Sequence, residues 1–353
     1  TRWSGGRPSL ASQTFTALKA SWGDGGSATA HDDGLAFGRA PDRAAAGTFS
    51  CMIRLIMGTA PIVIVRTNHT AVERARSLPN CLNMNNGPNL SVVIPILNEE
   101  EILWDNLCTL AAVFDDEAGP ASWRFVIVDN GSTDTTPEVL QQVAERWPLT
   151  TLILERSPNY GRALRAGLSA VDTPWVHQVD IEQWDLEFFR WAWRNRERYD
   201  VFMGSKRADP TLNQQSRYRK FLSWGLNALI KGFFNYVGTD THGPKLLRTA
   251  ALRPILAECR MSWGQFDSEF MIRGSRAGLS FCEVPVVYIE HRPSRKLMIE
   301  KIGRNVWEFN RLRRIMRRQD SGGLIRFESF PRTVVLEENA AAKAAAAAKT
   351  AVR

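Results

Sequence analysis

The chain has 353 residues, of which 44% are hydrophobic and 23% are charged, and its formal net charge is +8. This composition allows a sizeable buried core and excludes collagen-like, disulfide-scaffold and wholly disordered proteins. The five cysteines are odd in number and form no Cys-x-x-Cys motif, which indicates neither a disulfide framework nor a zinc site and fits a reducing cytosol.

The first part of the chain shows little periodicity. Residues 1–50 are rich in Gly, Ala, Ser and Arg, which is typical of a segment that does not fold on its own. Met84 precedes the first convincing strand and is a candidate natural start. We therefore expect residues 1–88 to be a disordered or non-native extension.

An alternating pattern of strands and helices follows. Short apolar runs predict strands at 91–96, 124–129, 150–154 and 174–180, and the stretches between them predict helices at 99–114, 137–147 and 161–171. Strands that are apolar throughout suit a sheet covered on both faces, so we expect an α/β fold with a mostly parallel central sheet flanked by helices. Ligands of such sheets bind beyond the carboxyl ends of the strands.

Polar residues follow each of these strands. They form the segments 98–101 (NEEE), 129–134 (DNGSTD), 159–162 (NYGR) and 180–182 (DIE). Each segment alone has a structural alternative: for example, Asn98 and Thr133 could be helix N-caps, and 129–132 (DNGS) could be a turn. Four such segments at one edge of a sheet indicate a binding site.

The ordered series of motifs resembles the family 2 glycosyltransferases of GT-A fold, in the branch of dolichol-phosphate mannose synthase and bacterial polyprenyl-phosphate glycosyltransferases. The motifs are SVVIPILNEEE (91–101), VIVDNGSTDTT (126–136), NYGRALRAG (159–167), VDIEQWDLEFF (179–189), VFMGSKRADP (201–210), GTDTHGPKLLRTAAL (238–252) and FDSEFMIRGSRAGLSFCEVPV (266–286). The resemblance covers about residues 90–310. It implies a Rossmann-like catalytic domain over 89–290 that inverts the anomeric centre of a nucleotide sugar.

The resemblance also implies residues for the donor. Those expected to bind it are Pro95, Asn98, Glu99, Asp129, Asn159, Gly161, Arg162 and Lys245. Asp180 and Glu182 are two residues apart at the predicted end of a strand, where side chains share a face, so we expect them to hold Mg²⁺ or Mn²⁺. The family more often has Asp-x-Asp followed by Leu-Gln, whereas Trp184 stands here in place of that Gln. A solvated acidic turn without metal is the alternative.

The acceptor side is basic. Lys206, Arg207, Arg217 and Arg219 are expected to bind an acceptor phosphate, because guanidinium groups suit that ligand. The apolar stretch 216–236 is either core or rests on lipid. Asp267 joins Asp180 and Glu182 as a candidate catalytic residue: it would be a general base for a hydroxyl acceptor, whereas a phosphate acceptor needs none.

The end of the chain carries the positive charge. Residues 291–318 hold ten Lys and Arg against two Glu, so 291–320 is expected to be a basic amphipathic helical segment, and 321–353 a low-complexity tail. The basic segment is either a solvated helix or a helix that docks on an anionic membrane surface. No nucleic-acid recognition module accompanies the charge, so nucleic acid is not an expected partner.

These features lead to one function and two rivals. We expect a metal-dependent inverting glycosyltransferase that moves sugar from a nucleotide sugar to a polyprenyl phosphate, peripheral at the cytoplasmic face of a membrane. Whether a partner subunit supplies a membrane anchor stays open. One rival is a soluble transferase that acts on a sugar or protein hydroxyl, with Asp267 or Glu269 as base. The other is a non-catalytic peripheral membrane protein of the same fold.

Overall fold

The computed structural model describes residues 52–57, 60–66, 87–155, 157–289, 298–316 and 326–351. Two short strands fall inside the range in which the sequence predicts an extension, and the rest of that range up to residue 86 lies outside the described residues. The division into an extension, a catalytic domain, a basic segment and a tail therefore stays a prediction.

Helices and strands alternate from residue 90 onward, as expected. In chain order they are β1 (Met52–Met57), β2 (Ala60–Arg66), β3 (Leu90–Ile96), α2 (Leu103–Glu117), β4 (Trp123–Asp129), α3 (Thr136–Arg146), β5 (Thr151–Leu154), α4 (Tyr160–Ser169), β6 (Trp175–Gln178), α5 (Leu186–Arg194), η2 (Arg196–Arg198), β7 (Val201–Ser205), α6 (Arg217–Phe234), β8 (Lys245–Arg248), α7 (Thr249–Glu258), α8 (Phe266–Arg276), β9 (Ser280–Pro285), α9 (Met298–Met316), β10 (Arg326–Ser329) and α10 (Arg332–Ala351).

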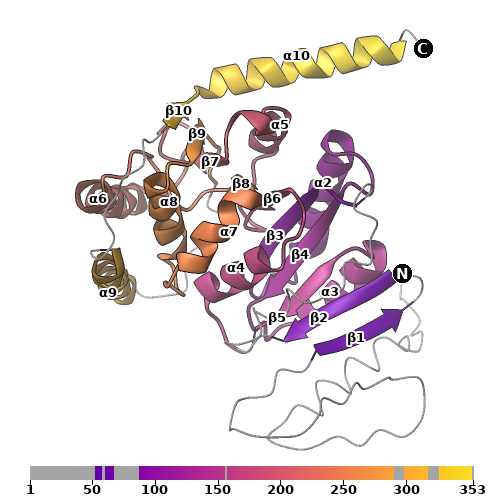
Figure 1. Cartoon of the computed structure of the whole chain (residues 1–353), viewed down its shortest axis with the longest axis horizontal. Helices are drawn as coiled ribbons and strands as arrows, with labels where there is room; N and C mark the ends of the chain where they lie inside the picture. Colours follow the sequence, from indigo (N-terminus) through magenta and orange to yellow (C-terminus); the bar gives the residue numbers. More distant parts are fainter. Residues whose placement is uncertain are drawn as a thin grey trace, which may run out of the picture.

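The strands form one mostly parallel sheet in the order β1-β2-β5-β4-β3-β6-β8-β7-β9-β10. Antiparallel pairs are confined to β1–β2 and to β8, which lies between β6 and β7. The expected α/β class of Rossmann-like GT-A type, with a mostly parallel sheet flanked by helices, is confirmed (Figure 1).

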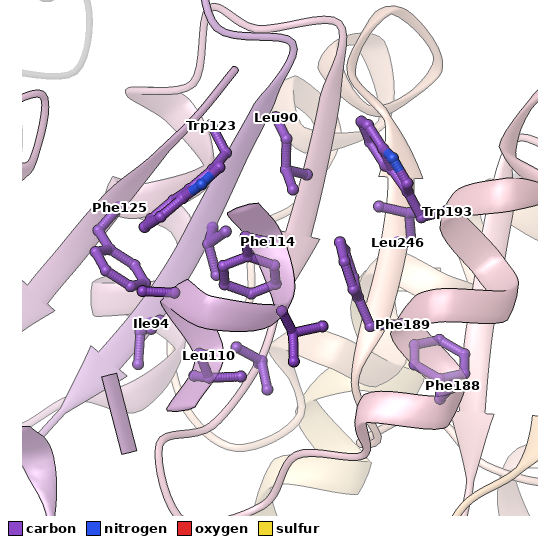
Figure 2. Packing of buried hydrophobic residues seen from close by; sticks show 14 of the residues in the cluster. Leu90, Ile94, Leu110, Phe114, Trp123, Phe125, Phe188, Phe189, Trp193 and Leu246 are labelled. Atoms are coloured by element: carbon purple, nitrogen blue, oxygen red, sulfur yellow. The ribbon is translucent and has the colours of Figure 1, made fainter. Parts of the chain in front are cut away.

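The core lies on both faces of this sheet because successive strand residues point to opposite sides. On β4, Phe125 and Ile127 pack on one face, whereas Val126 and Val128 pack on the other. Phe114 of α2 lies among aromatic rings from β4 and α5 on the first face, with its centroid 4.7 Å from that of Phe189 (Figure 2). Both faces of the parallel strands are thus covered, as their continuous apolar sequences predict.

Helices α6 and α9 contact each other at one side of the molecule (Figure 1). Phe309 of α9 lies against Phe233 and Phe234 of α6, with ring centroids 5.5 and 5.9 Å apart. Neither these nor any other helix in the described ranges has the length and apolar character needed to cross a bilayer.

The C-terminal segment joins the fold. Strand β10 pairs in parallel with β9 at the edge of the sheet, and α10 then runs over α5 and extends beyond it (Figure 1). Val335 of α10 is fully buried, and the Trp191 indole donates a hydrogen bond of 2.7 Å to Glu338. The first half of α10 is therefore part of the packed structure.

Candidate active site

The carboxyl ends of β5, β4, β3 and β6 meet at one edge of the sheet. Ile96 at the end of β3 lies opposite Asp129 at the end of β4, which in turn lies opposite Leu154 at the end of β5. The topology thus brings the four polar segments that follow these strands to the same edge.

Two of these segments are joined by hydrogen bonds between loops. Asn98 has a φ of 57°, a left-handed conformation that Asn tolerates well. Its backbone N–H donates to Ser132 Oγ at 2.9 Å, and its side-chain oxygen accepts from Thr133 N at 2.8 Å. The Glu99 N–H donates to Thr136 Oγ1 at 2.9 Å. Pro95 lies within β3, and the loop that follows Ile96 is held in one shape by the loop after β4.

Asp129 is buried at the end of β4, beside these loops. One of its carboxylate oxygens accepts a hydrogen bond of 2.9 Å from Ser132 N, and burial raises the pKa of the carboxyl above its usual value. A buried carboxylate at a strand end can accept hydrogen bonds from a ribose hydroxyl, which is the role that the sequence predicts.

The start of α4 forms the next part of the edge. The Asn159 side chain caps the helix by accepting from Arg162 N at 3.1 Å, and Asn159 N donates to Asn130 Oδ1 at 2.7 Å. A Cβ on Gly161 would lie 2.4 Å from the Trp263 carbonyl oxygen, so only glycine allows this close approach. The Arg162 guanidinium is paired with Glu155 at 2.8 Å.

A pocket of about 350 Å³ lies beyond β6 and β7. Its walls come from the Val179–Asp185 turn, the loop after β7, the loop before β8, the start of α8 and the end of β9, and its outer part from α6 and α9. Of the expected site residues, Asp180, Lys206 and Arg207 line it. Negative and positive groups thus face one cavity.

Asp180 is joined to a buried polar cluster behind the pocket wall. Tyr160 donates a hydrogen bond of 3.2 Å to Asp180 Oδ1. Asp267, from the first turn of α8, accepts from Lys245 Nζ at 2.8 Å and from Gln178 Nε2 at 3.0 Å. Burial, and next the charge of Asp267, raise the pKa of Asp180 to about 6.

The same cluster determines where Lys245 and Asp267 point. Their side chains are 0% and 1% exposed and form an ion pair. The Lys245 ammonium, expected to face the donor diphosphate, also donates to the Gly243 carbonyl at 3.0 Å. The Lys245 ammonium is therefore already paired with the Asp267 carboxylate, and its role at the donor stays a prediction.

Glu182 lies in a turn and not in a strand, so the alternation from which the sequence places it on one face with Asp180 does not apply. Its charge still adds to the raised pKa of Asp180, and its role as a metal ligand stays a prediction. Strand β6 ends at Gln178 rather than at residue 180, and the chain then turns, with Gln183 N donating to the Asp180 carbonyl at 3.0 Å. Asp180 lines the pocket of 350 Å³, whereas Glu182 lines a neighbouring pocket of about 330 Å³. The alternation of a strand cannot be applied beyond the residue where the strand ends.

Two of the four basic residues expected at the acceptor line the pocket. Lys206 and Arg207 line the pocket with Asp180, and the Lys206 ammonium lies 4.3 Å from the centre of the Tyr288 ring. Burial lowers the pKa of Lys206 against the attraction of Asp240. Arg217 and Arg219 lie in the first turn of α6, outside the set of residues that line the pocket.

Comparison with known proteins assigns part of the chain to a family. Residues 91–180 match the family model of glycosyl transferase family 2. The matched segment is less than half of the chain. It holds the carboxyl ends of the four strands β3, β4, β5 and β6 and ends at Asp180, so the resemblance read from the sequence is confirmed.

Several curated relatives match the glycosyltransferase segment and its surroundings. An uncharacterized glycosyltransferase of Mycobacterium tuberculosis is 38% identical over 96 residues, 27% of this chain and 38% of that protein. A dolichyl-phosphate beta-glucosyltransferase of Trichomonas vaginalis is 28% identical over 57% of this chain and 66% of its own length. An undecaprenyl-phosphate 4-deoxy-4-formamido-L-arabinose transferase of Photorhabdus laumondii is 34% identical over 40% and 43%. The chain thus spans between 38% and 66% of these relatives.

Among solved structures, a mannosyltransferase from Pyrobaculum calidifontis in complex with GDP-Man and Mn²⁺ is similar at a TM-score of 0.48 and 18% identity, covering 71% of each chain.

The carboxylates beside the pocket fit a divalent cation that is shared with a substrate. Within the described residues no three His, Cys, Asp or Glu side chains come together as a metal cage. Asp180 is nevertheless a buried carboxylate whose pKa is raised by burial and next by the charge of Asp267, and the Lys245 ammonium is paired with Asp267. Mg²⁺ commonly takes one or two carboxylates, with phosphates and water as the remaining ligands. Asp180 lines the pocket and would hold it, and Glu182 stays the second predicted ligand.

Sequence reasoning missed the buried acid of β9. Glu283 is 1% exposed and accepts hydrogen bonds from Thr239 N at 2.9 Å and from Asp240 N at 3.1 Å. It thereby fixes the loop before β8. A charged residue inside the apolar strand 280–285 was the available signal, because buried charges in strands are rare unless they have partners.

We expect Asp129→Ala to weaken binding of a nucleoside diphosphate by about 10- to 100-fold, because a hydrogen bond to a charged group contributes roughly 1.5–3 kcal/mol. Calorimetric titration measures this. Asp129→Asn keeps the acceptor for Ser132 N and separates loss of charge from loosening of the loop. Asp116→Ala, at the exposed far end of α2, is the matched control. Unchanged affinity in Asp129→Ala would place the nucleoside elsewhere.

Proposed function

We propose that the protein is a metal-dependent inverting glycosyltransferase that moves a sugar from a nucleotide sugar to a polyprenyl phosphate at a membrane surface. The observation that carries the proposal is the pocket in which Asp180 and the pair Lys206 and Arg207 face the same cavity. The carboxylate suits the cation of a diphosphate, and the two cations suit an acceptor phosphate. The relatives named for transfer to dolichyl and undecaprenyl phosphate support this pairing of substrates.

Different residues of the pocket would bind the donor and the acceptor. A divalent cation, when bound, would offset charge on the departing nucleoside diphosphate. Asp180, held by the Tyr160 hydroxyl, would orient that end of the donor. Lys206 and Arg207 would place the acceptor phosphate, one of whose oxygens attacks the anomeric carbon as the bond to the diphosphate breaks. Attack from the opposite side inverts that carbon.

The geometry disfavours a hydroxyl acceptor. Asp267 is buried and paired with Lys245. Glu269 is fully buried, accepts from the backbone N–H of Met261 at 2.6 Å and pairs with Arg273 at 2.8 Å. Neither carboxylate is open to remove a proton from a substrate in the pocket. A phosphate acceptor is already anionic and does not require such a base.

Arg207 supports an anionic acceptor. Its Nη1 donates to the Thr239 carbonyl at 3.1 Å, whereas its buried Nε has no hydrogen-bond partner among the described residues. A buried donor without a partner costs free energy that a bound anion would recover.

The outer helices support contact with a lipid surface. Only Asn227, Ile230 and Phe234 of the 18 residues of α6 are buried. Phe221 and Trp224 are 64% and 65% exposed and stack with ring centroids 6.3 Å apart. Exposed aromatic side chains beside basic residues are typical of helices that lie in a membrane interface.

Helix α9 adds to the same surface while it also packs on the domain. Phe309, Leu312 and Met316 are buried, and Val306 and Trp307 are both 55% exposed. Ser223 and Leu226 of α6 and Asn305 of α9 line the pocket. The helices with exposed aromatic residues therefore also border the cavity that would receive the acceptor phosphate. Nothing in the comparisons points to an anchoring subunit, and none is proposed.

One assay tests the function. The protein is incubated with a panel of radiolabelled nucleotide sugars and Mn²⁺, with and without polyprenyl phosphate, and label is followed into lipid. We expect transfer that requires both the cation and the lipid phosphate. Transfer to water-soluble sugars or protein instead would favour the hydroxyl acceptor, and no transfer with any donor would leave only the non-catalytic rival.

We expect the double substitution Phe221→Ser and Trp224→Ser to weaken binding to anionic vesicles at least about tenfold, because burial of one large apolar side chain contributes roughly 1.5–3 kcal/mol. Co-sedimentation across a salt series measures the binding. Leu149→Ser, on the loop between α3 and β5, removes another exposed apolar residue and is the control. Equal sedimentation of the double variant and the control would show that α6 does not dock on lipid.

A further inference from the structure

The turn between β6 and α5 carries Asp180, Glu182 and Trp184, and it is held at its far end by Asp185. One oxygen of this buried carboxylate accepts from Phe188 N at 3.0 Å, which caps α5. The other accepts from Val287 N, beyond β9, also at 3.0 Å. Asp185 therefore ties the turn to both α5 and the segment after β9.

A third partner of Asp185 comes from the C-terminal segment. Arg332, the first residue of α10, forms an ion pair with both oxygens of Asp185, each at 3.0 Å. The two side chains are 12% and 5% exposed. Arg332 Nη1 also donates to the Pro285 carbonyl at 3.3 Å. Such a bidentate, desolvated pair is among the stronger side-chain interactions in proteins.

Arg332 is itself fixed in place by contacts on both sides along the chain. Before it, Phe330 N donates to the Glu283 carbonyl at 3.0 Å, and the Phe330 ring lies 5.2 Å from the Trp191 ring. After it, the Asn339 amide donates to the Glu187 carbonyl of α5 at 2.9 Å. The guanidinium therefore meets Asp185 on a rigid support rather than at the end of a loose segment.

The ion pair between Arg332 and Asp185 lies at the wall of the pocket, because Asp185 is one of the lining residues. Asp185 lines both the pocket that contains Asp180 and the neighbouring one that contains Glu182. Without Arg332, a buried carboxylate would keep only backbone donors, so its charge would draw in water or move outward. Entry of water or outward movement of Asp185 would displace the residues that connect Asp185 to Asp180.

We propose that Arg332 is a positioning residue for the Asp180–Asp185 turn, so that the segment 326–351 belongs to the architecture of the donor site and is not an appended tail. In its catalytic consequence this inference rests on the proposed glycosyl transfer. In its structural consequence it does not, because the order of the turn can be measured without substrate.

The test compares Arg332→Gln and Arg332→Lys with Lys343→Gln, which removes one positive charge from the exposed part of α10. Hydrogen–deuterium exchange is followed over peptides 179–189 and 123–129 in the metal-free protein. We expect Arg332→Gln to speed exchange in 179–189 and leave the β4 peptide unchanged. The lysine variant should lie between, because it keeps the charge and loses the bidentate fork.

Kinetics gives the second readout. We expect Arg332→Gln to lower kcat by about 10- to 100-fold, as a displaced catalytic group does. The KM for the nucleotide sugar should change less than about threefold, because the nucleoside binds at the other end of the site. If Arg332→Gln does not fold, the lysine variant carries the test.

Wild-type exchange at 179–189 in Arg332→Gln would overturn the proposal, and so would faster exchange with unchanged kcat. If the wild-type protein transfers no sugar from any donor, the proposed function fails. The exchange experiment then still decides whether Arg332 orders the turn.

Discussion

Asp180→Asn is expected to abolish sugar transfer and to make the metal-free domain more stable above pH 6. Asp180 lines the pocket of about 350 Å³ beyond β6 and β7, and in the proposed function it would hold the cation of the donor diphosphate. A cation at a departing phosphate supplies several kcal/mol of charge stabilisation, and a loss of about 4 kcal/mol corresponds to about a thousandfold in rate. The asparagine oxygen can still accept the Tyr160 hydroxyl hydrogen bond, so the local structure should persist.

The gain in stability follows from the pKa of Asp180. Burial and the charge of Asp267 raise the pKa from 3.8 to about 6 in the folded protein. Between these two values the folded state binds more protons than the unfolded state, so this group lowers stability as pH rises through that window. Asparagine carries no charge and avoids the loss. The variant should therefore melt above the wild type at pH 8 and close to it at pH 4.

Melting curves from pH 4 to pH 8 without metal, together with turnover at low Mn²⁺ concentration, measure both effects. Asp116→Asn, an exposed carboxylate of α2, is the control for a general effect of charge. Wild-type turnover in Asp180→Asn would show that the metal assignment is wrong. A melting temperature that does not rise at pH 8 would show that Asp180 bears no electrostatic penalty.

The parts of this architecture that sequence predicts are those encoded locally. Strands β3 to β6 are recognised from short apolar runs, and the parallel order then places the segments that follow them at one edge. Asn159 is an example: it follows β5 in the chain and is found at that edge, where its side chain also caps α4.

Contacts between distant segments are not encoded in any local pattern. Glu283 reaches Thr239 across 44 residues, and Arg332 reaches Asp185 across 147. Only the assembled sheet, with β8 antiparallel between two other strands and β10 at the edge, brings these residues together. The alternation argument for Glu182 fails for a local reason instead: the strand was predicted two residues too long, so a rule for strands was applied to a turn.

The buried pair of Lys245 and Asp267 gives the largest expected change in stability. We expect Lys245→Met to lower the free energy of unfolding by about 3–5 kcal/mol, because it leaves a buried carboxylate without its cation. Gln178 Nε2 would remain as a donor to Asp267, at 3.0 Å, and Asp180 would remain as a nearby like charge. Urea unfolding at pH 7 measures the loss.

The double variant Lys245→Met with Asp267→Asn is expected to recover most of this loss, because the uncompensated charge is gone and Gln178 still has an oxygen to bond. Arg326→Met is the control: its pair with Glu328, at 3.2 Å, is exposed, and such pairs contribute about 0–1 kcal/mol. If Lys245→Met costs no more than Arg326→Met, the pair is not desolvated. If the double variant is as unstable as Lys245→Met, the loss comes from packing and not from charge.

Lys245→Met should also change the pKa of Asp180, the candidate metal ligand. The charge of Lys245 lowers the pKa of Asp180 against the effects of burial and of Asp267. Without that charge, Asp180 should keep its proton to a pH above about 6, and the pH range over which the metal-free domain loses stability should extend upward. The double variant removes the opposing charges of Lys245 and Asp267 together, so its range should return toward that of the wild type. Melting curves of the three proteins on one pH scale therefore test whether Asp180, Asp267 and Lys245 act as one electrostatic unit, and identical pH ranges would show that they do not.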